Sequence, residues 1–317
     1  MIPGLVGRWL AAGQLDLALP GSGQTAQRWH RLAELTSADV VAGRLAEAHT
    51  DAIAILAELR GPDPKPGQLW GVWAAESPDA VLRVHSDGDG TMLDGTKVWC
   101  SGAGICTHAL VTARIETDGG SDGRGLFAVD LSDPHVHPLP SNWRNPGMAA
   151  SDTRSVQFHG APAVAVGAPG DYLDRPGFWH GAIGVSACWL GGARAVAAPL
   201  YERAGRDSAD AHTLAHLGAV DAALAAAEAT LVSAACQVDA DPSNREGRAE
   251  LIARRTRAVV ETAVDEAITR TGRALGPGPL AQEARHAARV ADLTIYVRQS
   301  HAERDLAELG RLAGRHR

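Results

Sequence analysis

The sequence has 317 residues, which is enough chain for two or three packed units. Hydrophobic residues make up 45% but aromatic residues only 4%, so helix contacts are expected to depend on closely packed Ala, Leu and Val. The net charge of -7 and the pI near 6.0 predict a soluble, mildly acidic surface, and they argue against nucleic acid or an anionic membrane as the main partner.

The first ten residues contain a short apolar patch that Pro3 and Gly4 interrupt. This patch is far shorter than the core of a signal peptide or a membrane-spanning helix, so we expect a cytoplasmic protein. The four cysteines form no C-x-x-C pair and have no histidine at zinc-ligand spacing. The sequence therefore predicts buried free thiols and no metal site.

The first expected region, residues 1–66, is a short N-terminal helical domain. A loop at Leu19–Gly23 precedes two expected helices, over residues 25–35 and 37–59. Apolar residues recur every three or four positions in the second of these, which is typical of one buried helical face. Three prolines between Gly61 and Gly67 then remove backbone donors and fix φ, so the helical region is expected to end there.

The second expected region, residues 67–176, is a small β domain. Short runs rich in β-branched residues alternate with Gly and Asp clusters, a pattern that predicts hairpins in a compact antiparallel barrel or sandwich. The expected strands are residues 69–75, 80–85, 91–99, 109–115, 125–130 and 155–159. Turns are expected at Asp87–Gly90, Asp94–Gly95 and Asp118–Gly120.

The third expected region, residues 177–317, is a C-terminal four-helix bundle. The helical pattern returns at Phe178 and continues nearly to the end. Breaks are expected at residues 206–210, 239–244 and 276–279. Between Leu217 and Val238 the apolar spacing alternates three and four over several turns, which favours an antiparallel bundle. The predicted fold class is thus mainly α with a central β domain.

Four motifs follow one another in a fixed order. They are WGVWAAESP at Trp70–Pro78, LDGTKVWCSG at Leu93–Gly102, GMAASDT at Gly147–Thr153 and GAIGVSACWLG at Gly181–Gly191. Ile295-Tyr296, followed by Arg304, closes the series. Together these segments resemble successive signatures of the flavin-dependent acyl-CoA dehydrogenase family, from about Leu69 to the end of the chain. Their occurrence in order makes the resemblance more specific than any single motif.

The resemblance implies N-terminal helices, a small β-barrel and a C-terminal four-helix bundle, with FAD between barrel and bundle. Trp99 stands at the position of the family's aromatic residue beside the flavin, and Ser101 at that of the nearby hydroxyl. An indole can exclude water from the flavin face and a hydroxyl can bond its polar edge. The family's Gly-Ser-Asp segment after the first motif is missing here, because the next expected strand begins soon after Pro78.

The resemblance also implies contributions to the cofactor site from a partner subunit. It places Arg203 where an arginine reaches the cofactor phosphates, and Arg273, Gly276 and Gly278 where the family meets a partner's pyrophosphate. From the residues alone, Arg203 could equally cap a helix and the glycine turn could be a simple helix stop. We therefore expect a homodimer or homotetramer.

The catalytic base is the largest departure from the family. Oxidation of an acyl thioester requires a carboxylate to take the α proton. The closing motif places Val297 at that position, and the family's alternative position falls near Gly181, so neither carries a carboxylate. His180 and His301 lie near the two positions, and an imidazole can act as a base, although most such histidines are only core or surface groups.

Three functions stay open at this point. The first is a flavin oxidoreductase that acts on an acyl thioester or similar small molecule with a non-standard base. The second is a flavin monooxygenase on the same scaffold, in which reduced flavin activates oxygen and no Glu base is required. The third is a catalytically silent subunit that keeps the fold.

Overall fold

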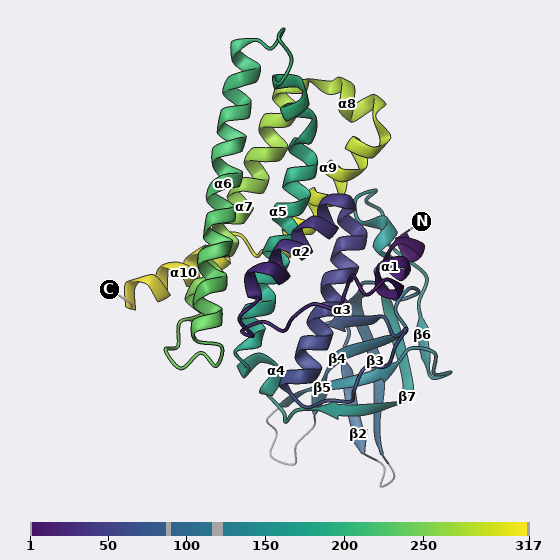
Figure 1. The fold of residues 1–317 in the computed structure, drawn as a ribbon. Helices are drawn as coiled ribbons and strands as arrows, with labels where there is room; N and C mark the ends of the chain where they lie inside the picture. Colours follow the sequence, from purple (N-terminus) through teal and green to yellow (C-terminus); the bar gives the residue numbers. More distant parts are fainter. Residues whose placement is uncertain (1, 87–89, 116–122, 316–317) are drawn as a thin grey trace. The chain divides into compact units, whose positions relative to one another are not determined.

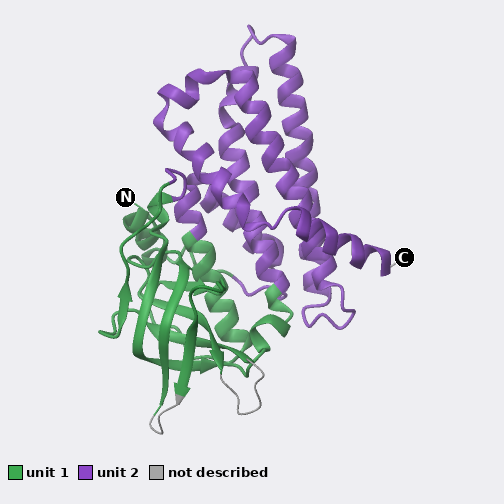
Figure 2. Ribbon diagram, turned by 180° about the vertical axis from the view of Figure 1, so that it is seen from behind, with its two compact units in different colours: residues 1–17, 45–144, 149–178 green, residues 18–44, 145–148, 179–317 purple. Residues whose placement is uncertain are grey.

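The computed structural model describes residues 2–86, 90–115 and 123–315 of the chain. They form a mainly helical protein with a small β-barrel, which confirms the predicted fold class (Figure 1). The chain divides into two compact units, coloured separately in Figure 2. Unit 1 comprises residues 1–17, 45–144 and 149–178, and unit 2 comprises residues 18–44, 145–148 and 179–317.

Three helices lie in the N-terminal region, where the sequence predicted two. The predicted pair is confirmed as α2 (Thr25–Ala38) and α3 (Val40–Glu58). The helix that was missed is α1 (Ile2–Ala11), which buries Val6 and Trp9. Its proline lies in the first helical turn, where a backbone N–H has no partner within the helix, so the residue that suggested a break is compatible with helix.

Five strands of unit 1 close into a barrel in the order β4-β2-β3-β7-β5, with β5 returning to β4. The strands are β1 (Trp70–Trp73), β2 (Leu82–Ser86), β3 (Thr91–Cys100), β4 (His108–Ile115), β5 (Gly123–Asp130), β6 (Val136–Pro138) and β7 (Arg154–Val166). β1 adds to β4 and the three-residue β6 adds to β7. The sequence missed β6, which is too short to show a period of two.

The predicted all-antiparallel pairing was wrong in two places. Both β1 and β2 run parallel to β4, β1 beside its first half and β2 beside its end. Turn residues indicate where the chain reverses between consecutive strands. They carry no information about β1 and β2 pairing with β4, because these strands are not consecutive in the sequence. The Asp94-Gly95 turn was also wrong, because both residues lie inside β3, where Gly95 has φ +117°. The other two predicted turns fall wholly or partly on residues outside those described.

Alternation along the strands separates two cores in unit 1. Ala109, Val111 and Ala113 of β4 belong to the cluster that also contains Phe127 and Phe158. The intervening Leu110 belongs to a second cluster, together with Leu126 of β5 and Ile55 and Leu56 of α3. One face of the sheet is therefore covered by the second half of α3, and the other is filled by barrel side chains. Shorter elements of this unit are η1 (Ala149–Ser151) and α4 (Asp171–Asp174).

Unit 2 contains three long helices, α5 (Gly177–Ala204, its first two residues in unit 1), α6 (Ala211–Ala240) and α7 (Ala249–Leu275). The face predicted for α6 is buried at Val220, Leu224, Ala227, Leu231, Ala234 and Val238, while Leu217 is only partly buried. The chain continues through α8 (Pro277–Gln282), α9 (Ala284–Tyr296), η2 (Val297–Gln299) and α10 (Glu303–Arg315). The break predicted at residues 276–279 is confined to Gly276, since Pro277 begins α8.

Two helices of unit 2 differ in how far their apolar surface is covered. Both α5 and α6 are long and apolar enough to cross a membrane by length and composition alone. The apolar segment of α5 is 78% buried, as expected for a core helix, whereas that of α6 is 33% buried. The predicted burial of the thiols holds for three cysteines and is wrong for Cys236, which is exposed on α6.

Candidate functional site

Trp99 stands out on the surface of unit 1. Lys97 pairs with Val156 of β7 and Cys100 pairs with Arg154. The stretch of β3 between these pairs has one residue more than the stretch of β7 opposite it, so Trp99 lies in a β-bulge. Its φ is +59°, in the left-handed region that a bulky residue rarely adopts. The bulge turns the indole outward, and its side chain is 61% exposed. A large, exposed aromatic held in a strained backbone is typical of a ligand contact.

Ser101, the second predicted cofactor residue, is the point where the first three motifs meet. Its carbonyl oxygen accepts the indole N–H of Trp73 at 2.9 Å, and its hydroxyl oxygen accepts the hydroxyl of Thr153 at 3.0 Å. The next residue, Gly102, donates its N–H to the carbonyl of Ser151 at 2.8 Å. Segments far apart in the sequence thus fix the half-buried Ser101 beside Trp99.

A buried ion pair joins the first motif to the second. The ammonium of Lys97 donates to Glu76 Oε1 at 2.8 Å and to the carbonyl and hydroxyl oxygens of Thr112 at 2.9 and 2.7 Å. The side chain of Lys97 is 4% exposed and that of Glu76 is 27% exposed. All three ammonium protons are used, so the pair ties the segment after β1 to the strand that carries Trp99.

Trp143 is a candidate that the sequence did not reveal. It lies half-buried in the connection between β6 and η1, and its ring meets that of Trp99 edge-on at a centroid distance of 6.3 Å. A loop residue carries no periodic signal, so only the tertiary structure could bring it to this place. The two indoles and the Ser101 hydroxyl can together hold a planar ligand with a polar edge. Within the described ranges, no three His, Cys, Asp or Glu side chains form a metal site.

In unit 2, the residue at the expected base position lies in the core. Val297 opens η2 and is fully buried. The adjacent Tyr296 is also buried, and its ring meets that of Trp189 edge-on at a centroid distance of 6.3 Å. The guanidinium of Arg257 lies over the Trp189 ring, 4.5 Å from its centroid. The closing motif therefore anchors the connection between α9 and α10 in the bundle, and Val297 offers no group that could move a proton.

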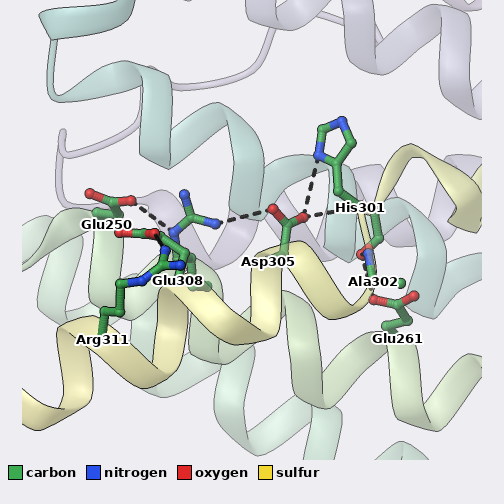
Figure 3. A network of polar contacts seen from close by, with 9 residues as sticks. Glu250, Glu261, His301, Ala302, Asp305, Glu308 and Arg311 are labelled. Carbon is green, nitrogen blue, oxygen red and sulfur yellow. Dashed lines mark hydrogen bonds and ion pairs between the residues drawn. The ribbon is translucent and has the colours of Figure 1, made fainter.

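His301 lies four residues further on, in a polar network whose contacts Figure 3 shows, and its side chain is exposed. Its N–H donates to Asp305 Oδ2 at 3.0 Å, and its exposed ring lies 3.6 Å from the same atom. Arg254 joins Asp305 to Glu250, at 3.1 and 2.8 Å. The network fastens the start of α10 to α7, which accounts for the position of His301 as a surface group.

His180 lines a cavity of its own in unit 2. It is buried near the start of α5 and lines a small cavity of about 90 Å³. The polar lining residues from the end of α6 to the start of α7 are Gln237, Asp241, Asn244, Glu246 and Arg248. Among the described residues that line this cavity, neither Val297 nor His301 occurs. The three predicted substrate-pocket residues are therefore not gathered in it.

The remaining predicted cofactor residues lie at helix ends in unit 2. Arg203 and Arg273 are exposed in the last turns of α5 and α7. Gly276 ends α7 with φ +72°, and Gly278 lies within α8, so this turn is a helix stop. Contact of these four residues with the cofactor of a partner subunit stays a prediction.

Asp292 is a half-buried carboxylate on α9 that the motif comparison did not single out. Its Oδ1 accepts the N–H of Met148 at 2.6 Å, and Met148 has φ +57°. Burial raises the pKa of this carboxyl, the Met148 N–H opposes the rise, and the carboxylate of Asp39 adds to it. Asp292 therefore holds Met148 on α9, while burial makes the charged form of its carboxyl unfavourable.

This raised pKa predicts how stability depends on pH. The folded state binds the Asp292 proton more tightly than the unfolded state, so the stabilisation is complete below about pH 4 and is lost as pH rises through the raised pKa. Asp292→Asn keeps an oxygen for the Met148 N–H and removes the charge. We expect urea unfolding at pH 7 to give a higher free energy for this variant, with a flatter pH profile than wild type. Exposed Asp207→Asn is the control, and a less stable Asp292→Asn at pH 7 would contradict the argument.

Comparison with known proteins identifies the fold. Residues 74–161 match the model of the acyl-CoA dehydrogenase middle domain. L-evernosamine nitrososynthase from Micromonospora sp. is 38% identical over 91 residues, which are 28% of this chain and only 21% of that protein's length. The match thus spans about a fifth of this relative.

Two solved structures cover nearly the whole chain. TdsC from Paenibacillus sp. A11-2, a dibenzothiophene monooxygenase crystallised with FMN and indole, has a TM-score of 0.80 and 20% identity, covering 92% of this chain and 84% of TdsC. Methanesulfinate monooxygenase MsuC from Pseudomonas fluorescens has a TM-score of 0.79 and 18% identity, covering 96% and 88%. Such identities establish the likeness of fold. The chain therefore has the acyl-CoA dehydrogenase-like fold that its motifs predicted, and its residues 74–161 match the middle domain of that family.

Proposed function

We propose that this chain is a flavin-dependent monooxygenase, which uses reduced flavin and dioxygen to oxidise a small organic molecule. The full burial of Val297 at the expected base position carries the proposal. Removing the α proton of a thioester needs a base within hydrogen-bond reach, and an aliphatic side chain cannot serve. A bound reduced flavin would supply the oxygen-activating chemistry. The chain's own residues then have to hold the flavin and shape the substrate site.

We further propose FMN as the flavin, in place of the FAD expected from the sequence. The FMN-containing structure of TdsC supports a mononucleotide, and the shortened segment after the first motif offers fewer groups to a larger cofactor. The residues of unit 1 fit such a group. Trp99 would cover one ring face with its exposed indole, and Ser101 would donate a hydrogen bond to the ring edge.

The substrate we propose is a small molecule with an oxidisable nitrogen or sulfur atom. The names of the nitrososynthase, the dibenzothiophene monooxygenase and the methanesulfinate monooxygenase support this class, because each refers to a nitrogen or sulfur function. An acyl thioester, the substrate expected first, would require the base that this chain lacks at the aligned position.

Incorporation of labelled oxygen into a product tests the function. Purified protein with FMN reduced by a flavin reductase is supplied with dibenzothiophene, indole or an amino sugar in ¹⁸O₂. We expect a product that carries one labelled oxygen and forms only with protein present. Rapid anaerobic bleaching of the oxidised flavin by an acyl-CoA would instead establish a dehydrogenase. Failure to bind any flavin would establish a silent subunit.

Loss of the Trp99 side chain should weaken flavin binding directly. Trp99→Ala removes an exposed aromatic contact, so we expect the loss of about 1 to 3 kcal/mol of binding free energy, with little change in thermal stability. Equilibrium titration with FMN measures the effect. Exposed Leu139→Ala, also in unit 1, is the control. Unchanged affinity in Trp99→Ala would remove this residue from the site.

We also propose that the chain forms a homo-oligomer, as the sequence resemblance implies. The apolar segment of α6 is only 33% buried within the chain, and Leu214 and Val232 on this helix are about half exposed. A second copy would cover this apolar surface. Light scattering at micromolar concentration tests the proposal, and a monomer would contradict it.

A further inference from the structure

Three hydroxyl groups of unit 1 form a chain with a definite direction. Thr153 Oγ1 donates to Ser101 Oγ at 3.0 Å, and the hydroxyls of Ser151 and Thr153 are 2.8 Å apart. A hydroxyl has a single proton. Because Thr153 gives its proton to Ser101, the bond between Ser151 and Thr153 must have Ser151 as donor. The direction of the chain is therefore Ser151 to Thr153 to Ser101.

The end of this chain is a hydrogen-bond donor. The structure gives Ser101 Oγ an incoming bond, and among the described residues no hydrogen bond donated by this hydroxyl is found. Ser101 is half-buried, whereas Ser151 is 1% exposed, so the chain runs from the interior toward the surface beside Trp99. Donors in series polarise one another, which makes the last O–H a stronger donor than an isolated serine.

We propose that Thr153 and Ser151 are positioning residues that direct the Ser101 proton toward an acceptor atom on the bound ligand. The inference rests on the proposed function, since the ligand class is a planar heteroaromatic with a ring nitrogen or carbonyl oxygen at its edge, as in oxidised FMN. Hydrogen bonds from Gly102 and Gly104 to the Ser151 carbonyl and the Asp152 carboxylate, both 2.8 Å, hold the segment in register. The series of hydroxyl bonds thereby prevents Ser101 from turning its proton inward.

A mutant cycle read out by binding of oxidised FMN and by its visible spectrum tests this proposal. Thr153→Val should weaken FMN binding about 3- to 10-fold, the value of one hydrogen bond, and Thr153→Ser should restore it. Ser101→Ala should weaken binding at least as much. The double variant should bind like Ser101→Ala, because Thr153 acts only through Ser101. Both single variants should shift the flavin absorption in the same direction, which a merely structural change would not do.

The control is Thr96→Val. Thr96 lies on β3 like Trp99, and this change removes its hydroxyl bond to Gln157, but Thr96 is not part of the series of hydroxyls formed by Ser151, Thr153 and Ser101. It should leave FMN affinity and spectrum unchanged. If Thr153→Val does not fold, Ser151→Ala carries the same prediction with a smaller loss of affinity. Losses of FMN affinity that add up in the double variant, or wild-type affinity in Thr153→Val, would overturn this inference but leave the proposed function standing. Wild-type protein that binds no FMN would overturn both the inference and the proposed function.

Discussion

Replacing Glu76 with alanine should lower the free energy of unfolding by about 3 to 5 kcal/mol, the cost of a buried charge that loses its partner. The ammonium of Lys97 is almost fully enclosed and would keep only the two oxygens of Thr112. Burial already lowers the pKa of Lys97, against the opposing effect of the Glu76 carboxylate. Urea unfolding at pH 7 measures the loss.

The pH dependence makes this prediction sharper. Without Glu76 the folded state holds the Lys97 proton even less tightly than the unfolded state, so Glu76→Ala should regain stability as pH rises from 7 toward the ordinary lysine value. Adding Lys97→Met should recover much of the loss at pH 7, because no unpaired charge remains. Glu34→Ala, which breaks an exposed pair with Arg31, is the control and should cost less than about 1 kcal/mol. A loss below about 1 kcal/mol for Glu76→Ala would contradict the buried-charge argument.

Replacing Gly191 with alanine should destabilise unit 2 by about 1 to 3 kcal/mol or more. An ideal Cβ at this position of α5 would lie 2.0 Å from the carbonyl oxygen of Ala33 and 2.8 Å from its Cα. These atoms belong to the backbone of α2, so no side chain can move aside and the helices must separate. Thermal unfolding of the purified variant measures the effect.

Two glycines provide graded comparisons for this change. At Gly192 the nearest atom to a Cβ would be Leu293 Cδ1 at 2.8 Å, the end of a flexible side chain, so Gly192→Ala should be milder. Gly218 on α6 has nothing within 4 Å, and Gly218→Ala should stabilise the helix by up to about 1 kcal/mol. Equal effects at Gly191 and Gly218 would show that helix propensity, rather than the close approach of α2, decides the outcome.

Local pattern was sufficient for the helices and most strands. The apolar spacing of α3 and α6 identified both helices, because a helix that packs on one side must repeat its apolar residues every three or four positions. It also identified most of the buried residues of α6, but α3 is buried on more than one face, as Ala42, Ala46 and Thr50 show. The same argument failed for β6, which is only three residues long. It also failed for α1, where Pro3 and Gly4 concealed a short helix.

The sequence by itself indicated the fold, through four motifs in order, and it singled out Trp99, Ser101 and Val297 as predicted site residues. Only the tertiary structure decided how these groups are held. The bulge that exposes Trp99 depends on the register between β3 and β7, and the hydroxyl of Ser101 is bonded by that of Thr153, 52 residues away. Glu76 meets Lys97 only because the barrel closes around them. Such contacts join segments whose separation along the chain carries no local signal, so they arise from packing of the whole barrel.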